Sequence, residues 1–139
     1  MVIKVLAYIT RGAAENREIL VFRHRDFPEA GVQVVGGTVD ANEDLEIALR
    51  REIEEESGLR GLEMVREIAT VRRFSPHHNE WQERHFFHLR AQTDLPASWL
   101  HVVSKGERDE GLVFCFEWWP IERVANELMD GKQDFVRAL

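Results

Sequence analysis

The sequence is poor in cysteine, in positive charge and in long apolar runs. Its 139 residues include one cysteine, Cys115, which excludes an internal disulfide and favours a reducing compartment. No apolar run approaches the ~20 residues that a membrane-spanning helix requires. Residues 1–4 also lack the layout of a secretory signal peptide. We therefore expect a cytoplasmic protein that has no membrane partner.

Basic residues are outnumbered by acidic ones, 18 against 25, for a formal net charge of −7. Duplex nucleic acid is bound by basic surfaces, so the composition argues against that class of partner. Hydrophobic residues make up 44% of the chain and charged residues 31%, as in ordinary globular domains. The length fits a single domain over residues 1–139.

Acidic residues concentrate between residues 37 and 59. On a helix over residues 43–57, Glu52, Glu55 and Glu56 lie at positions i, i+3 and i+4 and share one face. Like charges at this spacing repel each other, and the helix dipole disfavours anions near the C-terminal end. A hard divalent cation would remove both penalties, since Mg²⁺ binds carboxylate oxygens.

The spacing of this segment resembles the signature of the Nudix hydrolases. The fixed residue types of that signature are all present, at Gly37, Glu43, Arg51, Glu52, Glu55, Glu56 and Gly58, with Ile53 and Leu59 at its apolar positions. At about 5–7% usage per residue type, seven such matches arise by chance roughly once in 10⁸ windows. The resemblance implies the α+β Nudix fold, a mixed β-sheet packed between helices. It also implies hydrolysis of a nucleoside diphosphate derivative by metal-assisted attack of water on phosphorus.

The resemblance assigns the metal ligands and the catalytic groups. Glu55 and Glu56 would bind Mg²⁺, with Mn²⁺ as a substitute, helped by the carbonyl of Gly36. Glu52 would bind metal or act as general base, because subfamilies differ on this point. Arg51 would orient Glu52 through an ion pair.

Two further positions of the signature carry implied roles. Glu43 would lie in the first helical turn and hold Arg51. Gly37 would let the backbone approach the metal closely. Glu46 and Glu54 fall at variable positions of the signature, and we expect them to be solvated.

Outside this segment the sequence leaves alternatives open. A further acidic ligand is expected from the loop before the last core strand, where Glu110 is preferred and Glu107 is also present, with Asp109 between them. Glu80 or Glu83 is the alternative, and a plain solvated loop is the competing interpretation.

Two other groups have candidate roles in substrate binding. Arg23 or Arg25 can hold a substrate phosphate, although a basic surface strand is the preferred explanation for them. The loop carrying His77 and His78, with Trp81 beside it, has the side chains to stack on a base, although such residues are as often ordinary loop residues.

The hydrophobic pattern predicts strands at residues 2–10, 18–25, 32–35, 62–74, 80–91 and 112–119, with a short one near 100–103. The first helix is predicted to begin at Asp40 or Asn42 and to end before Gly58. Pro120 is predicted to open a second helix.

Three other side chains have predicted environments. Trp118 and Trp119 should point to opposite faces of one strand, one into the core and the other to a pocket or a subunit interface. Cys115 should be buried in the core.

These observations indicate a Nudix pyrophosphohydrolase, monomeric or homodimeric, that acts on a nucleotide-type small molecule. The alternative is a Nudix-fold module that senses a nucleotide without hydrolysing it. Such modules usually lose one of the acidic residues that this chain retains.

Overall fold

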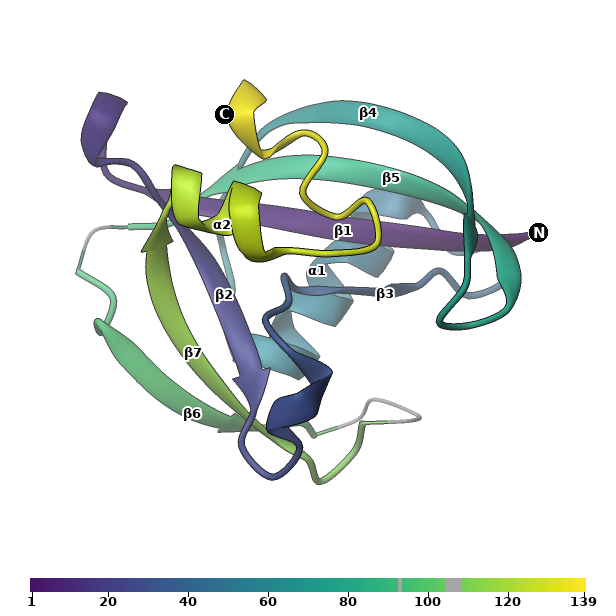
Figure 1. The fold of residues 1–139 in the computed structure, drawn as a ribbon, viewed down its shortest axis with the longest axis horizontal. Coiled ribbons are helices and arrows are strands. Elements are labelled where there is room, and N and C mark those ends of the chain that lie inside the picture. The colour runs from purple at the N-terminus through teal and green to yellow at the C-terminus, as the bar shows by residue number, and fades with distance from the viewer. Residues whose placement is uncertain (93, 105–108) are drawn as a thin grey trace.

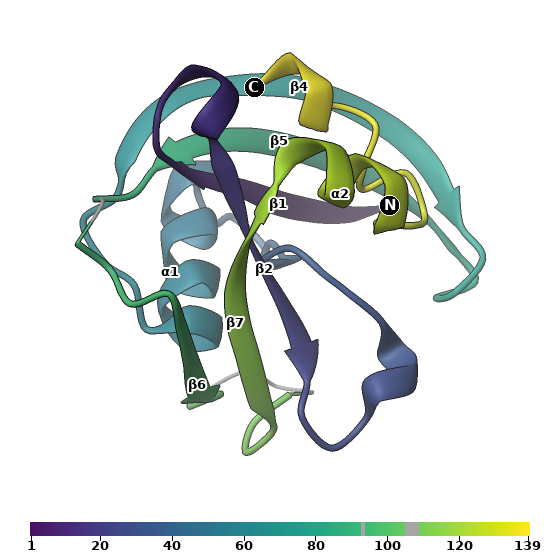
Figure 2. The ribbon, with the colours of Figure 1, turned by 60° about the vertical axis from the view of Figure 1, so that its left-hand side comes forward.

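The computed structural model describes residues 1–92, 94–104 and 109–139. In this part of the chain, seven strands form one mixed sheet and two α-helices pack against it (Figures 1 and 2), which confirms the expected α+β architecture. The strands are β1 (Val2–Arg11), β2 (Glu18–His24), β3 (Gly36–Thr38), β4 (Glu63–Ser75), β5 (Glu80–Arg90), β6 (Ser98–Val102) and β7 (Val113–Pro120). The α-helices are α1 (Leu45–Ser57) and α2 (Ile121–Glu127). Among the described helices, none is long and apolar enough to cross a membrane.

Strand β1 is the centre of the sheet, whose order is β4-β5-β1-β2-β7-β6. One edge of β1 pairs in parallel with β5 from Val2 to Thr10. The other edge is shared, because β3 pairs with residues 4–6 and β2 pairs with residues 10 and 11, both antiparallel. This division places the glycine-rich strand β3 against the N-terminal half of β1.

The two faces of β1 belong to two different hydrophobic clusters. Its alternate residues Val5, Ala7 and Ile9 pack with α1, while Leu6 and Tyr8 pack with α2 and the C-terminal segment. Figure 2 shows α1 on one side of β1 and α2 on the other. The period-2 alternation of strand side chains therefore builds both layers from a single strand.

The short strand lies at residues 36–38 and not at 32–35 as predicted. Gln33 makes only an isolated bridge to Phe22, whereas Gly36 and Gly37 pair with Leu6 and Val5. A Cβ at Gly36 would lie 2.6 Å from the carbonyl oxygen of Val5. The glycine allows this close pairing, which the apolar pattern of residues 32–35 does not reveal.

Helix α1 begins later than the sequence predicts. Its N-cap is Asp44, whose side chain accepts hydrogen bonds from the N–H groups of Glu46 and Ile47, so Asp40 and Asn42 are not the cap. Glu43 therefore precedes the helix and is not in its first turn. The predicted end is confirmed, because Gly58 adopts the left-handed conformation there with φ of 80°.

Three predictions about β7 need correction or refinement. Trp118 and Trp119 do point to opposite faces, but both are buried in the core, each in a different cluster. Cys115 is half-buried and lines a hollow on the sheet surface instead of lying in the core. Pro120 is the last residue of β7 and the N-cap of α2.

Candidate active site

Helix α1 gathers the three predicted carboxylates on one side. Glu56 is 7% exposed, and the side chains of Glu52 and Glu55 are 13% and 14% exposed. Charged carboxylates are rarely this shielded unless they are paired. The grouping that the i, i+3, i+4 spacing predicted is therefore present, and its members face protein and not bulk water.

Arg51 stands among these acids and contacts most of them. Its Nη1 lies 2.9 Å from Glu52 Oε1 and 3.4 Å from Glu55 Oε2. Its Nε and Nη2 donate to the two oxygens of Glu43, and Nη2 also donates to the carbonyl of Thr38 at 3.1 Å. The hydrogen bonds from Arg51 lower the pKa of Glu43 to about 2. One guanidinium thus joins the loop before α1 to two of the three acids.

Gly36 and Gly37, the first two residues of β3, close the site from the sheet side. The Gly36 N–H donates to Glu56 Oε1 at 3.0 Å. A Cβ at Gly37 would lie 2.2 Å from Glu52 Cδ, so a larger residue would collide with that carboxylate. In this structure Gly37 makes room for Glu52.

The positive charge of Arg51 does not balance the acids around it. Burial raises the pKa of Glu52 to about 7, and the Glu55 charge adds to the rise that Arg51 opposes. Burial also raises the pKa of Glu56 well above its ordinary value. The hydrogen bond from Gly36 lowers this pKa, and the charge of Glu52 raises it further. Two neighbouring carboxylates therefore lack enough positive charge to stabilise their ionised forms.

Strand β6 positions the C-terminal end of α1. Trp99 Nε1 donates to the Ser57 carbonyl at 3.1 Å, and His101 Nε2 lies 3.0 Å from the Glu55 carbonyl. The last carbonyls of a helix have no partner within the helix. These contacts satisfy two of them at the turn that carries Glu55 and Glu56.

The donor set suits a hard divalent cation. Carboxylate oxygens and a peptide carbonyl are the ligands that Mg²⁺ takes in proteins. Over residues 1–92, 94–104 and 109–139, no three acidic, His or Cys side chains already converge at metal-binding distance. Glu52 and Glu55 are both turned toward Arg51. A cation would compete with Arg51 for these oxygens and relieve the charge imbalance.

The loop before β7 contributes an acid that the sequence interpretation passed over. Asp109 is half-buried, and its charge raises the pKa of Glu56. Glu110 is exposed, and Glu107 lies outside the described residues. The spacing of acidic residues within a loop does not tell which carboxylate faces inward. The sequence therefore offers no reason to prefer Asp109 over the two glutamates beside it.

The alternative acids on β5 are engaged elsewhere. Glu83 contacts His85 Nε2 at 2.9 Å and Arg72 Nε at 3.5 Å. Glu80 accepts a hydrogen bond from Gln82 Nε2 at 2.8 Å. Neither contact involves the acidic face of α1.

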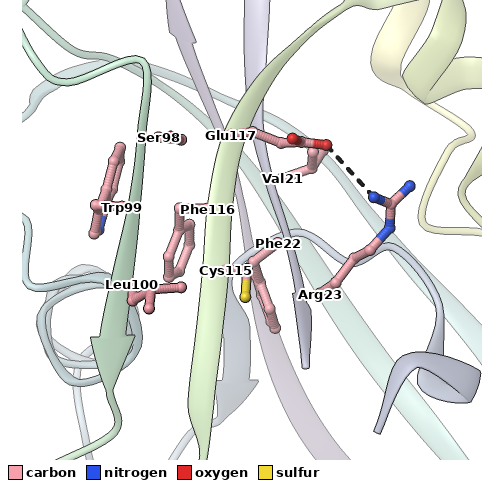
Figure 3. Close-up of a pocket in the computed structure, with 9 residues that line it drawn as sticks. All are labelled: Val21, Phe22, Arg23, Ser98, Trp99, Leu100, Cys115, Phe116 and Glu117. Atoms are coloured by element: carbon pink, nitrogen blue, oxygen red, sulfur yellow. Dashed lines mark ion pairs between the residues drawn. The ribbon is translucent and has the colours of Figure 1, made fainter. Parts of the chain in front are cut away.

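The two arginines of β2 lie apart from the carboxylates. Arg23 lines a hollow of about 220 Å³ between β2, β7 and β6, where its Nη1 is 3.6 Å from Glu117 Oε1 (Figure 3). Its guanidinium also lies 5.1 Å from the centre of the Trp119 ring. Arg25 is exposed and pairs with Asp26. No residue that lines the hollow comes from α1.

Two lysines near the acidic face were missed in the sequence. Lys4 on β1 lowers the pKa of Glu52, and Lys132 in the C-terminal segment lowers that of Glu56. The chain contains three lysines in all. Lys4 and Lys132 are 128 positions apart, so nothing in their spacing indicates that they lie near the same site.

Comparisons with known proteins agree with this architecture. The NUDIX domain family model matches residues 2–139. The Caenorhabditis elegans Ap4A hydrolase in a binary complex is similar, with a TM-score of 0.72 at 16% identity over 99% of this chain and 93% of that one. The NUDIX domain of Shewanella oneidensis NrtR complexed with ADP ribose gives a TM-score of 0.71 at 15% identity, over 97% and 83% of the two chains.

A third similar structure is the MutT protein from Methanosarcina mazei Go1, with a TM-score of 0.67 at 19% identity over 99% of this chain and 91% of that one. No curated protein is similar enough in sequence to count as a match. The family model covers the whole sheet, both helices and the acidic segment, so the chain belongs to the Nudix domain family.

Proposed function

We propose that this protein is a metal-dependent pyrophosphohydrolase that cleaves a phosphoric anhydride bond in a nucleoside diphosphate or triphosphate derivative. The observation that carries the proposal is the group of shielded acids Glu52, Glu55 and Glu56 on α1. Arg51 pairs with Glu52 and Glu55, while Gly37 and Gly36 of β3 lie against Glu52 and Glu56. Such a group of shielded acids has no structural use, since it costs stability through repulsion and desolvation.

The metal would be Mg²⁺, with Mn²⁺ as a substitute, held by Glu52, Glu55, Glu56 and the carbonyl of Gly36. Glu110 is the further ligand suggested by the sequence. Bound there, the cation would neutralise charge on the phosphate oxygens and polarise the attacking water.

The electrostatics of Glu56 also support Asp109 as that further ligand, because its charge reaches the Glu56 carboxylate. Exchanging Asp109 and Glu110 for their amides one at a time separates the two assignments. The ligand is the one whose loss weakens Mg²⁺ binding.

The catalytic roles divide between α1 and the turn before it. Glu52 serves as a ligand or takes the proton of the attacking water as general base. Arg51, held by Glu43, orients Glu52, and Gly37 leaves the space that the Glu52 carboxylate occupies. Arg23 and Arg25 are proposed to hold a substrate phosphate, for which Arg23 would exchange its ion pair with Glu117.

A nucleotide-type small molecule is the proposed substrate, and the site would work in the cytoplasm as a monomer or homodimer. An Ap4A hydrolase and a domain complexed with ADP ribose among the similar structures support this ligand class. The rival is a module that binds a nucleotide without cleaving it. The complete set of acidic residues on α1 favours hydrolysis over that rival.

A panel of nucleoside triphosphates, nucleotide sugars, ADP-ribose and dinucleoside polyphosphates, assayed for phosphate and nucleotide release with Mg²⁺ and with Mn²⁺, tests the proposal. Turnover of at least one compound that disappears with EDTA is expected. Tight binding of a nucleotide with no turnover under either metal would establish the sensing module instead.

A further inference from the structure

Lys4 lies on β1 opposite β3, the strand whose Gly37 lies against Glu52. Its pairing partners are Thr38 on β3 and Arg84 on β5, so the three side chains leave the sheet on the same face. The Lys4 ammonium donates to Thr38 Oγ1 at 2.7 Å. Thr38 follows Gly37 directly, so this positive charge lies one residue along β3 from the glycine that contacts Glu52, and it lowers the pKa of Glu52.

Lys132 is brought to the same face by a turn that is anchored through its neighbours. The Tyr8 hydroxyl donates to the Lys132 carbonyl. Arg84, which is 1% exposed, donates to the carbonyl of Asp130 and, at 2.8 Å, to its carboxylate. A Cβ at Gly131 would lie 2.5 Å from Arg73 Nη1. These contacts hold the turn without using the Lys132 side chain.

The Lys132 ammonium is therefore available to a ligand. Among the described residues it forms no ion pair, because the nearby Asp130 carboxylate is held by Arg84 and Arg73. The residue is half-buried, and burial together with the charges of Arg84 and Lys4 lowers its pKa, which Asp130 and Glu56 oppose. A partly desolvated cation without a close counter-ion gains much from an anion.

Lys4 lowers the pKa of Glu52, and Lys132 lowers the pKa of Glu56, so each lysine acts on one of the acids. Two segments far apart in the sequence thus bring positive charge to Glu52 and Glu56. The acids and the lysines are close enough to influence each other's pKa. This arrangement is required if one ligand is to contact both a metal held by the acids and the lysines.

We propose that Lys4 and Lys132 form a binding site for a phosphoryl group next to the diphosphate that is cleaved. The inference rests on the proposed function and narrows it. Substrates with three or more consecutive phosphates, such as nucleoside triphosphates or dinucleoside polyphosphates, are favoured over nucleotide sugars, which have a neutral sugar at that position.

Binding of inorganic tripolyphosphate in EDTA tests the site without metal and without catalysis. Isothermal titration of the wild type should show tighter binding of tripolyphosphate than of pyrophosphate. Lys132→Met and Lys4→Met should each weaken tripolyphosphate binding by about tenfold or more, because each removes a charged donor. Lys132→Arg should retain most of the affinity.

Arg60→Met is the matched control, because it removes one positive charge from an exposed residue whose partner is Glu54. An equal loss of affinity in this control would overturn the proposal, since the effect would then be one of net charge. Unchanged binding in both lysine variants would overturn it as well. If Lys132→Met does not fold, Lys4→Met and Lys132→Gln decide the question.

Kinetics separate this inference from the proposed function. With a nucleoside triphosphate and a nucleotide sugar as substrates, Lys132→Met should lower kcat/KM for the triphosphate about tenfold more than for the sugar compound. Equal losses would overturn the phosphoryl site and leave the hydrolase intact. A wild type that cleaves nothing would end the hydrolase proposal, while the tripolyphosphate titration would still decide the site.

Discussion

Arg51 donates two parallel hydrogen bonds to Glu43, from Nε to Oε2 at 2.8 Å and from Nη2 to Oε1 at 2.9 Å. Glu43 precedes α1, so this bidentate pair joins the loop to the helix. The remaining nitrogen, Nη1, is left for Glu52 and Glu55. The planar guanidinium therefore serves two structural neighbours at once, which a lysine cannot do.

The first prediction concerns this pair. A double-mutant cycle of Glu43→Gln and Arg51→Lys should give a coupling free energy of about 1–2 kcal/mol in urea denaturation, because the pair is bidentate and partly shielded. Both single variants should also lose turnover, since Glu52 loses its orientation.

The exposed pair of Glu54 and Arg60 is the control for that cycle. Its side chains are 48% and 78% exposed although they lie 2.6 Å apart. Its coupling should stay below about 0.5 kcal/mol. Equal coupling free energies for the two pairs would show that the Arg51–Glu43 pair stabilises the fold no more than an exposed ion pair does.

The second prediction separates the acids of α1 by role. Glu55→Gln and Glu56→Gln should each lower kcat by at least about 10²-fold with the fold retained, because each removes a charged ligand and little packing. Glu54→Gln should leave kcat unchanged, since Glu54 faces solvent and Arg60. Near-wild-type turnover at saturating Mg²⁺ in either of the first two would remove that residue from the ligand set.

The sequence predicted most of α1 and its acidic face because this information is local. Residues at i, i+3 and i+4 share a face whatever the rest of the chain does. Gly58 ends the helix for an equally local reason, its left-handed conformation. The helix start was missed because Asp40, Asn42 and Asp44 are all good caps, and only the hydrogen bonds distinguish them.

The features that the sequence did not reveal depend on tertiary pairing. Strand β3 was misplaced because two glycines carry no apolar signal, although they pair with Val5 and Leu6. The turn that carries Lys132 is anchored by Arg84 and Tyr8, which lie far from it in the sequence. Neither relationship is encoded in spacing along the chain.

The third prediction tests why residue 37 is glycine. Gly37 has an ordinary strand conformation, so alanine introduces no backbone strain, but its Cβ would collide with the Glu52 carboxylate. Gly37→Ala should lower kcat at least about tenfold and stability by about 1–3 kcal/mol. In a Glu52→Gln background the same change should add little further loss of kcat. Fully additive losses would mean that Gly37 acts independently of Glu52.

The fourth prediction concerns the cation. Thermal melts in EDTA and in millimolar Mg²⁺ should show stabilisation by Mg²⁺ of about 1–3 kcal/mol at 10–100 times Kd. The gain should shrink strongly in Glu55→Gln/Glu56→Gln, whose helix face has lost two charges. That variant should be at least as stable as the wild type in EDTA, because repulsion and burial destabilise the acids. Equal Mg²⁺ shifts in the two proteins would place the cation elsewhere.

The fifth prediction concerns His88, a buried residue of β5, the strand that pairs with β4 on one side and with β1 on the other. Its Nε2 lies 2.8 Å from Thr10 Oγ1. Burial lowers its pKa to about 4, with further decreases from the charges of Arg17, Arg90 and Arg66. The unfolded chain binds the proton near pH 6.5, so between pH 6.5 and about 4 it holds more protons than the folded protein.

Stability should therefore fall as the pH drops through that window and change no further on this account below pH 4. The loss attributable to His88 is about 2 kcal/mol at pH 5. Urea midpoints at pH 7.5 and pH 5 measure it. His88→Gln should lose less stability between the two than the wild type, whereas the exposed His77→Gln should follow the wild type. The same loss in His88→Gln as in the wild type would show that other groups cause the acid sensitivity.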